Sequence, residues 1–444
     1  MRILEIELGQ PLPIISAFDD KTGKCYQRAS CLVRLHGQPL GIVAFEFVDS
    51  LLDPELYAEQ IWFTLKEKIN EHMQQDGLPS VIELNTNGLY SHVLPRCIEE
   101  REQFLIKAPF VSVVVPTHNR PEQLAACLSS LLSLSYPDYE VIVVDNAPGT
   151  NVTADLVQKL SVRASQLRYV REDNPGPSWA RNRGITIAKG KILVFADDDV
   201  VVDPFWLVEL VKGFSIADNV ACVSGLVLPL ELETPAQFLF EEHGGFSKGF
   251  NRRIFKLKME KHYPDMSLHP YTPGRYAAGA SMAFTSDFLH KVGGFDPALG
   301  GNGPSRNGQD IAIFFKVIVE GYTLVYEPRA LLYHLHRRDY AELSEQIYRY
   351  GIGLTAYLTK IVFDNPLMLV KMISKIPYGF FLIFSSQSSK NSKKLFSYSK
   401  NLTLLERKGM LYGPFAYVQS RWLAHKMRKA FSKDSSYPIG SKES

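Results

Sequence analysis

The sequence predicts an α/β protein built around a mostly parallel central sheet with helices on both faces. Apolar runs rich in β-branched residues occur at residues 111–115, 140–144 and 191–195, and such runs are typical of strands buried on both faces of a parallel sheet. Helical patterns separate the runs, which gives the alternation of βαβ units. The composition, 45% hydrophobic and 22% charged over 444 residues, is that of globular protein, and the length predicts more than one domain.

Residues 1–108 are predicted to form a small N-terminal α+β accessory module. Two strands are expected at 32–35 and 41–47, joined by the turn at 36–39. Apolar residues at helical spacing then predict a helix over residues 53–75. No residue of the module has a catalytic pattern, so its functional alternative is a surface that binds an acceptor or docks a partner.

Residues 109–340 are predicted to form the main domain, which carries the central sheet. In chain order the pattern gives strand 111–115, a helix that carries Leu124 and Leu128, strand 140–144, helix 152–163, strand 167–170, helix 177–188 and strand 191–195. Ligands of such sheets bind beyond the carboxyl ends of the strands. Polar residues follow three of these ends, at 117–119, 145–146 and 197–199.

Three consecutive aspartates, Asp197, Asp198 and Asp199, follow the last of these strands. Carboxylates packed together repel, and their desolvation is costly unless a cation compensates. A hard divalent cation such as Mg²⁺ or Mn²⁺ suits this arrangement, since it takes one or two protein carboxylates and leaves positions for substrate phosphates. A solvated acidic turn is the alternative, because acidic turns are common.

Several classes of protein are disfavoured. The chain has no GxGxxG and no GxxxxGK[ST] pattern, which disfavours a dinucleotide site and a P-loop. A net charge of +2 argues against nucleic-acid binding. Five cysteines with no CxxC pair predict reduced thiols in a cytosolic protein, and no histidine pairs with them at the spacing of a zinc site. The first residues do not have the pattern of a signal peptide.

Over roughly residues 110–340 the chain resembles the family 2 glycosyltransferases, which have a nucleotide-binding GT-A fold. Seven motifs occur in the order of that family: residues 113–120, 143–146, 180–185, 197–199, 279–282, 293–296 and 309–310. The resemblance implies inverting transfer of a sugar from a nucleotide-activated donor, usually with Mn²⁺ or Mg²⁺.

The resemblance also implies roles for individual residues in binding the donor. Asp145 would accept a hydrogen bond from the nucleotide base, for example from a uracil N–H, which favours a UDP-sugar. Asp199 would bind the metal ion. Pro116, Thr117 and Asn119 would form the floor under the base, and Asp198 would contact the ribose or the waters of the metal ion. Asp197 would be the first carboxylate of a D-x-D motif, and His334 would be a third ligand of the metal or the diphosphate.

Asp310 is the candidate general base, which would take the proton from the acceptor hydroxyl as that hydroxyl attacks the anomeric carbon. Its alternative is an N-terminal charge on the helix that follows. Gln309 replaces the acidic residue that the family usually has there, which puts acceptor positioning in doubt. Arg181 faces either the donor or solvent, and the small residues Gly279, Ala280 and Ser281 would either line the sugar site or pack tightly in a strand. Residues 300–308 have turn chemistry and could close over the donor.

Residues 341–444 are predicted to form a helical, basic C-terminal region. Apolar spacing predicts an amphipathic helix over 340–362, and the apolar stretch 361–384 is interrupted by charges and prolines, so we expect it to be buried or interfacial and not spanning. Residues 387–444 carry 12 Lys or Arg and 3 Asp or Glu. Two interpretations stay open: a peripheral membrane-binding tail and a solvated helical surface.

The function that the sequence predicts is metal-dependent inverting glycosyl transfer to a hydroxyl acceptor, a saccharide or lipid-linked saccharide in surface polysaccharide synthesis. We expect the protein to be cytoplasmic, either free or associated with the membrane at its cytoplasmic face. Two alternatives remain: a catalytically inactive sugar-nucleotide-binding or scaffold protein, which Gln309 favours, and a nucleotidyltransferase, which would be expected to have a glycine-rich loop after the first strand.

Overall fold

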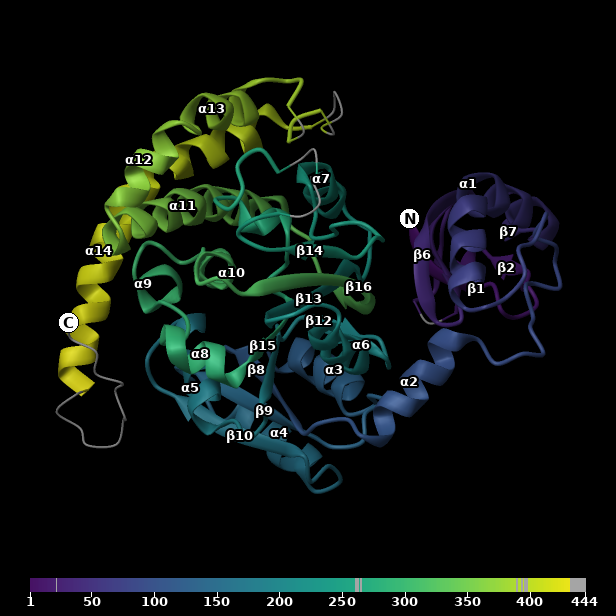
Figure 1. Ribbon diagram of the computed structural model, residues 1–444, viewed down its shortest axis with the longest axis horizontal. Helices are drawn as coiled ribbons and strands as arrows, with labels where there is room; N and C mark the ends of the chain where they lie inside the picture. Colours follow the sequence, from purple (N-terminus) through teal and green to yellow (C-terminus); the bar gives the residue numbers. More distant parts are fainter. Residues whose placement is uncertain are drawn as a thin grey trace.

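The computed structural model describes residues 1–20, 22–259, 263, 266–388, 390–392, 394 and 398–431 of the chain (Figure 1). An N-terminal module is joined by one helix to a large α/β body, and long C-terminal helices lie along the far side of that body (Figure 1).

The central sheet has nine strands within these residues, in the order β10-β9-β8-β11-β15-β13-β16-β12, with β14 on β16. The strands are β8 Val111–Thr117, β9 Tyr139–Asn146, β10 Leu167–Glu172, β11 Ile192–Ala196, β12 Val200–Val202, β13 Val220–Pro229, β14 Arg253–Phe255, β15 Ser281–Thr285 and β16 Thr323–His334. From their pairings, β8, β9, β10, β11, β13 and β16 point one way, and β12, β14 and β15 point the other way. The sheet is therefore mostly parallel, and the predicted α/β fold class is confirmed.

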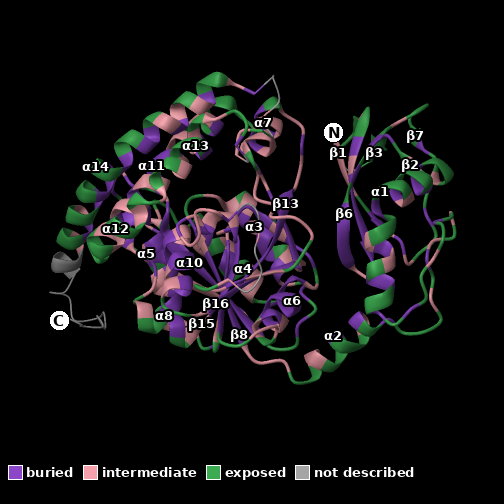
Figure 2. Cartoon of the chain, turned by 45° about the horizontal axis from the view of Figure 1, so that its top comes forward, coloured by how far each residue is buried: buried purple, intermediate pink, exposed green. Residues whose placement is uncertain are grey.

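Helices cover both faces of the sheet because alternate residues of each strand point to opposite sides. Val113 and Val115 of β8 face the core that contains α3, α4 and α6, whereas Val114 faces the core that contains α5, α8 and α10. These helices are α3 Pro121–Leu131, α4 Val152–Ser161, α5 Pro177–Ile187, α6 Trp206–Lys212, α8 Ser286–Val292 and α10 Gln309–Val319. Figure 2 shows the central strands as buried along their length.

Short elements complete the main domain. They are the helices α7 Pro235–His243 and α9 Pro297–Gly300 and the 3-10 turns η1 Gly213–Ser215 and η2 Pro273–Arg275. Helix α9 lies next to α5 and leads into the loop before α10.

The N-terminal module has a three-stranded sheet in the order β1-β5-β6, packed against α1 Pro54–Gln75. Its strands are β1 Arg2–Glu7, β5 Arg28–Leu35 and β6 Gln38–Glu46, with the short pairs β2 Ile15–Ser16 and β7 Leu51–Leu52, and β3 Phe18–Asp19 and β4 Lys24–Cys25. The turn between β5 and β6 is tighter than the predicted one at 36–39, since it consists of His36 and Gly37, whose φ values are 55° and 77°. Helix α2 Arg96–Ile106 then leads to β8.

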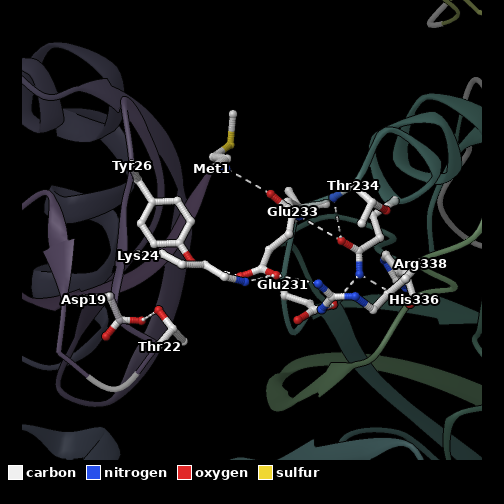
Figure 3. Close-up of polar contacts among 12 residues, drawn as sticks. Met1, Asp19, Thr22, Lys24, Tyr26, Glu231, Glu233, Thr234, His336 and Arg338 are labelled. Atoms are coloured by element: carbon white, nitrogen blue, oxygen red, sulfur yellow. Dashed lines mark hydrogen bonds and ion pairs between the residues drawn. The ribbon is translucent and has the colours of Figure 1, made fainter.

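The module contacts the edge of the main domain through charged groups (Figure 3). Lys24 Nζ lies 2.7 Å from Glu233 Oε2, and the Tyr26 hydroxyl donates to Glu233 Oε1 at 2.9 Å. Arg338, which follows β16, lies 2.7 Å from the same carboxylate. The Glu233 carboxylate of the main domain thus links Lys24 and Tyr26 of the module to Arg338 beyond the end of β16.

The C-terminal region consists of α11 Tyr340–Asp364, α12 Leu367–Ile373, α13 Ile376–Phe384 and α14 Lys400–Phe431. Helices α11 and α14 pack closely through glycines: a Cβ at Gly351 would lie 2.0 Å from the Glu406 carbonyl oxygen, and one at Gly409 would lie 2.2 Å from that of Tyr348. The predicted amphipathic helix over 340–362 is therefore present as α11, and α14 covers it.

Among the described residues, no single helix is long and apolar enough to cross a membrane. The pair α12 and α13 reaches the required length and hydropathy only when taken together, with a 58° bend between the two helices. Most large apolar side chains of this pair are exposed, including Leu367, Val370, Phe380 and Phe384.

Candidate active site

A cavity of about 370 Å³ opens at the carboxyl ends of β8 and β11. The start of α10, the end of β16 and one side of α11 form its other walls. It is lined by Pro116, Thr117, His118, Arg120, Asn146, Pro177, Arg181, Asp197, Asp198, Asp199, Phe246, Gly279, Ala280, Asn307, Gln309, Asp310, His334, Arg337, Gln346 and Tyr350. The position agrees with the rule that ligands of open α/β sheets bind beyond the strand ends.

The aspartate triplet lies in the cavity wall, where one hydroxyl group and arginine side chains contact it. The Thr117 hydroxyl donates to Asp198 Oδ2 at 2.8 Å. Arg120 Nη1 lies 3.3 Å from Asp198 Oδ1 and 3.2 Å from Asp199 Oδ2. Burial, together with the charge of Asp199, raises the pKa of Asp198 to about 6. The solvated acidic turn is thus excluded for Asp198 and Asp199, which are both buried.

Asp197, Asp199 and His334 form a group suited to a divalent cation. One oxygen from each carboxylate and one imidazole nitrogen lie within 4.8 Å of one another, and His334 Nε2 is 3.2 Å from Asp199 Oδ1. Burial lowers the pKa of His334, which favours the neutral imidazole that coordinates metals. Two carboxylate oxygens and one imidazole nitrogen are a donor set that fits a divalent metal ion.

Arg181, on α5, supplies a buried positive charge. Its Nη2 lies 2.9 Å from Asp197 Oδ1, while Nε and Nη1 have no hydrogen-bond partner among the described residues. A buried guanidinium with two free donors beside a cavity is suited to bind an anion.

Asp310 lies in the first turn of α10, in the same cavity as the triplet. Its Oδ1 accepts from the Ile311 backbone N–H at 2.9 Å. Gly279 leaves the space that the carboxylate occupies, since a Cβ there would lie 2.5 Å from Asp310 Oδ2. Asp310 is therefore both a negative charge at the N-terminus of a helix and a residue that lines the cavity.

Gln309 is buried between α10 and α9. A Cβ at Gly300 would lie 3.0 Å from Gln309 Cδ, and Gln309 Oε1 has no partner within the described part of the chain. An uncharged amide is compatible with this enclosed position because an unpaired carboxylate there would lose its hydration.

Three predicted site residues do not line the cavity. Asp145 is buried, and its Oδ2 accepts a hydrogen bond from the Tyr169 hydroxyl at 3.0 Å. Its Oδ1 has no partner among the described residues. Burial raises the pKa of Asp145. Asn119 is exposed, with φ 53°. Ser281 accepts a hydrogen bond from Trp206 Nε1 at 2.9 Å, so its side chain lies in the core. Of the glycine-alanine-serine motif, only the first two residues reach the cavity.

The predicted mobile loop 300–308 is packed against the C-terminal helices. The Ser305 backbone N–H donates to Ser420 Oγ of α14 at 2.9 Å, and Gly303 and Gly308 lie too close to α14 and α11 to carry a Cβ. Asn307 is the residue of this loop that lines the cavity. The contacts with α11 and α14 hold the loop in place.

The cavity also includes His118, Arg120 and Asn146, which lie in the predicted motifs but had no role of their own, and Phe246, which the sequence did not single out. Tyr350 and Gln346 come from α11, beyond the boundary predicted at residue 340, and Gln346 Nε2 donates to the Tyr350 hydroxyl at 3.1 Å. Tyr350 was expected to belong to the apolar stripe of that helix. Its spacing is that of a core residue, so no local signal distinguishes its role.

The fold and the site together define an α/β nucleotide-binding domain of the GT-A type. Residues 112–261 match the model of the family described as "Glycosyl transferase family 2". Glycosyltransferase AglE of Haloferax volcanii is 38% identical over 249 residues, which cover 55% of this chain and 73% of that protein. The chain belongs to glycosyl transferase family 2, and its main domain is a glycosyltransferase domain.

Two further proteins are similar over part of their length or at lower identity. The "Putative polypeptide N-acetylgalactosaminyltransferase 13" of Drosophila melanogaster is 31% identical over 244 residues, 52% of this chain and 42% of that protein, so the chain spans less than half of it. A solved mannosyltransferase from Pyrobaculum calidifontis, in complex with GDP-Man and Mn²⁺, has a TM-score of 0.42 and 18% identity over 77% of this chain and 84% of its own.

Proposed function

We propose that the protein is a metal-dependent inverting glycosyltransferase that moves a sugar from a nucleotide-sugar donor to a hydroxyl acceptor. One observation carries the proposal: the cavity holds a carboxylate and histidine group suited to a cation, and a separate carboxylate, Asp310, faces the same space. An inverting transfer uses a cation at the leaving diphosphate and a base at the attacking hydroxyl, and this cavity offers a candidate group for each role.

In this proposal the donor diphosphate lies between the metal group and Arg181. Mn²⁺ or Mg²⁺, held by Asp197, Asp199 and His334, would neutralise the charge that develops on the leaving nucleoside diphosphate. The free Nε and Nη1 donors of Arg181 are suited to bind a phosphate oxygen. Arg120 contacts Asp198 and Asp199 and offsets part of their negative charge.

The nucleotide base is proposed to lie toward the end of β9. Asp145 Oδ1 is a buried acceptor without a partner among the described residues, and its neighbour Asn146 lines the cavity. A base that offers an N–H, such as uracil, would satisfy this acceptor, which favours a UDP-sugar.

Asp310 acts as the general base in this proposal and takes the proton of the acceptor hydroxyl. Gly279 leaves room for its carboxylate, and Tyr350 lines the same cavity. A base on the first turn of a helix is held rigidly, which favours the alignment that transfer requires.

A thermal-shift screen of UDP-, GDP- and dTDP-sugars, with and without Mn²⁺, tests the donor and the metal together, since a ligand of the native state raises the melting temperature. We expect a shift with one nucleotide sugar that depends on Mn²⁺ and is lost in Asp199→Ala. Asp310→Asn should keep this shift and lose transfer, whereas unchanged transfer would contradict the base assignment. A protein with the shift and no transfer to any hydroxyl acceptor would instead be an inactive sugar-nucleotide binder.

We further propose that α12 and α13 bind the surface of a membrane at its cytoplasmic face. The exposed side chains of Leu367, Val370, Phe380 and Phe384 form an apolar surface, and lysines of α12 and the following turn border it. An apolar face bordered by basic groups is suited to an anionic lipid surface. A lipid-linked saccharide acceptor of surface polysaccharide synthesis would then meet the cavity at that surface.

Sedimentation with anionic and with neutral vesicles tests the membrane proposal. The variant Val370→Glu/Phe380→Glu should lose binding to anionic vesicles, and Phe63→Glu, which changes an apolar residue of α1 that is even more exposed, should keep it. Equal binding by all three proteins, or none by the native chain, would refute a lipid-binding role for α12 and α13.

A further inference from the structure

Four side chains with metal-binding atoms converge inside the N-terminal module, away from the cavity. They are His36 of the β5–β6 turn, His72 near the end of α1, Asp76 just after α1, and Cys97 in the first turn of α2. All four side chains are at most 6% exposed. The ligand atoms, one from each residue, lie within 4.8 Å of one another.

Three of the candidate ligand atoms lie close to Asp76 Oδ2. His36 Nδ1 lies 2.6 Å from it, His72 Nε2 lies 3.1 Å from it, and Cys97 Sγ lies 3.0 Å from it. The two imidazole nitrogens are themselves 3.1 Å apart. Four tetrahedral ligands at the Zn–N, Zn–O and Zn–S bond lengths of about 2.0 to 2.3 Å would lie about 3.3 to 3.7 Å from one another. The four observed distances are shorter than the lower limit of this range by about 0.2 to 0.7 Å, so the ligand atoms would move slightly apart around a zinc ion.

We propose that His36, His72, Asp76 and Cys97 bind one structural Zn²⁺ ion in the N-terminal module. Two imidazoles, a thiolate and a carboxylate are the ligand types of protein zinc sites, and four protein ligands leave no open position, as in structural sites. A thiolate and two imidazoles are softer than the all-oxygen sets that Mg²⁺ and Ca²⁺ take. The proposal does not rest on the glycosyltransferase assignment.

The backbone around the ligands holds them in place. Glu7 accepts from the backbone N–H groups of His36 and Gly37, both at 2.9 Å, so the turn that carries His36 is anchored to β1. His36 has φ 55°, a conformation that costs free energy in a residue other than glycine. Asp76 Oδ1 accepts from the Cys97 backbone N–H at 3.0 Å, which fixes the start of α2 beside the other ligands.

The sequence does not predict this site because its ligands come from three separate elements. His72 and Asp76 are four residues apart and share one side of α1, whereas His36 and Cys97 are 36 and 21 residues away from the nearer of the two. The spacing of cysteines and histidines along the chain predicts no zinc site. The fold of the module brings the four side chains together.

A zinc ion here would fix the helix that joins the module to the main domain. Helix α2 carries Cys97 at one end, and Arg101 of the same helix lies 3.7 Å from the centre of the Phe205 ring and 3.7 Å from Glu209 of the main domain. The proposed role of the ion is therefore to hold α2, and through it the module, in a fixed position.

Metal analysis of the full chain tests the proposal. We expect purified protein, produced without a histidine tag and dialysed against a metal-free buffer, to retain one zinc per chain. Cys97→Ser and His72→Ala should retain almost none. Two controls should keep the full zinc content: Cys25→Ser, which changes an exposed thiol, and Asp199→Ala, which changes the proposed metal group of the cavity.

Cobalt substitution and chelation give readouts that do not require the variants to be equally stable. Co²⁺ bound to the native chain should show a thiolate-to-cobalt charge-transfer band and intense tetrahedral d–d bands, and Cys25→Ser should show them too. A strong chelator should lower the melting temperature of the native chain, and added Zn²⁺ should restore it. Native protein that carries no zinc after growth with zinc, and whose melting is unchanged by the chelator, would overturn the proposal. Full zinc retention in both Cys97→Ser and His72→Ala would overturn it as well.

Discussion

The substitution Gly279→Ala tests the geometry of the cavity because it adds one methyl group beside the proposed base. The new Cβ would lie 2.5 Å from Asp310 Oδ2 and 3.0 Å from Asp310 Cβ, whereas ordinary contacts begin at 3.4 Å. The carboxylate would have to move by about 0.9 Å, and a misplacement of about 1 Å at a reacting group can lower the rate about 100-fold. That factor corresponds to about 2.7 kcal/mol of transition-state stabilisation.

The assay is the steady-state rate of sugar transfer with the donor found in the thermal-shift screen. We expect kcat to fall about 100-fold in Gly279→Ala while the donor's dissociation constant changes little, because the methyl group displaces the base and not the metal group. Gly274→Ala is the matched control, since its Cβ would meet Ile311 Cγ2 at an ordinary 3.4 Å. Native kcat in Gly279→Ala, or an equal fall in Gly274→Ala, would refute the reasoning.

Three further predictions concern donor binding, interdomain contact and pH. Arg181→Gln should weaken donor binding by about 1.5 to 3 kcal/mol, measured by calorimetry, because it removes a charged donor. Arg34→Met should destabilise the folded chain by about 3 to 5 kcal/mol, since it leaves the buried Asp203 carboxylate, 2.6 Å away, without its cation; chemical denaturation measures this, and recovery in Arg34→Met/Asp203→Leu is the check. Burial raises the pKa of Asp198 from its usual 3.8 to about 6, so the folded state holds this proton more tightly than the unfolded one. The contribution of Asp198 to stability should therefore fall as pH rises from about 4 to about 6, and comparing melts of native protein and Asp198→Asn across that range would reveal it.

Periodicity identified the four strands β8 to β11 of the main sheet correctly because it is a local property, whereas β12 to β16 were not predicted from it. The β-branched runs became β8, β9 and β11, and the helical stripe at 340–362 became α11. The triplet and Asp310 also reached one cavity, since the ends of parallel strands meet at one edge of the sheet.

The direction of individual side chains was less predictable. Ser281 follows two cavity residues but bonds to Trp206, because successive side chains of a strand point to opposite faces. Asp145 does not line the cavity, and the Tyr169 hydroxyl donates to its Oδ2. Such orientations depend on which neighbour packs against each face.

The sequence by itself determined the α/β class, the order of the strands and helices between residues 111 and 195, and the motifs that place the chain in its family, since these follow from the local pattern of residues. The tertiary structure decided which distant side chains meet. Tyr350 reaches the cavity from a helix outside the expected domain, and Cys97 joins His36 across 61 residues of chain. Contacts of this kind depend on how α2 and α11 pack, and packing between elements far apart in the chain leaves no periodic signal in the sequence.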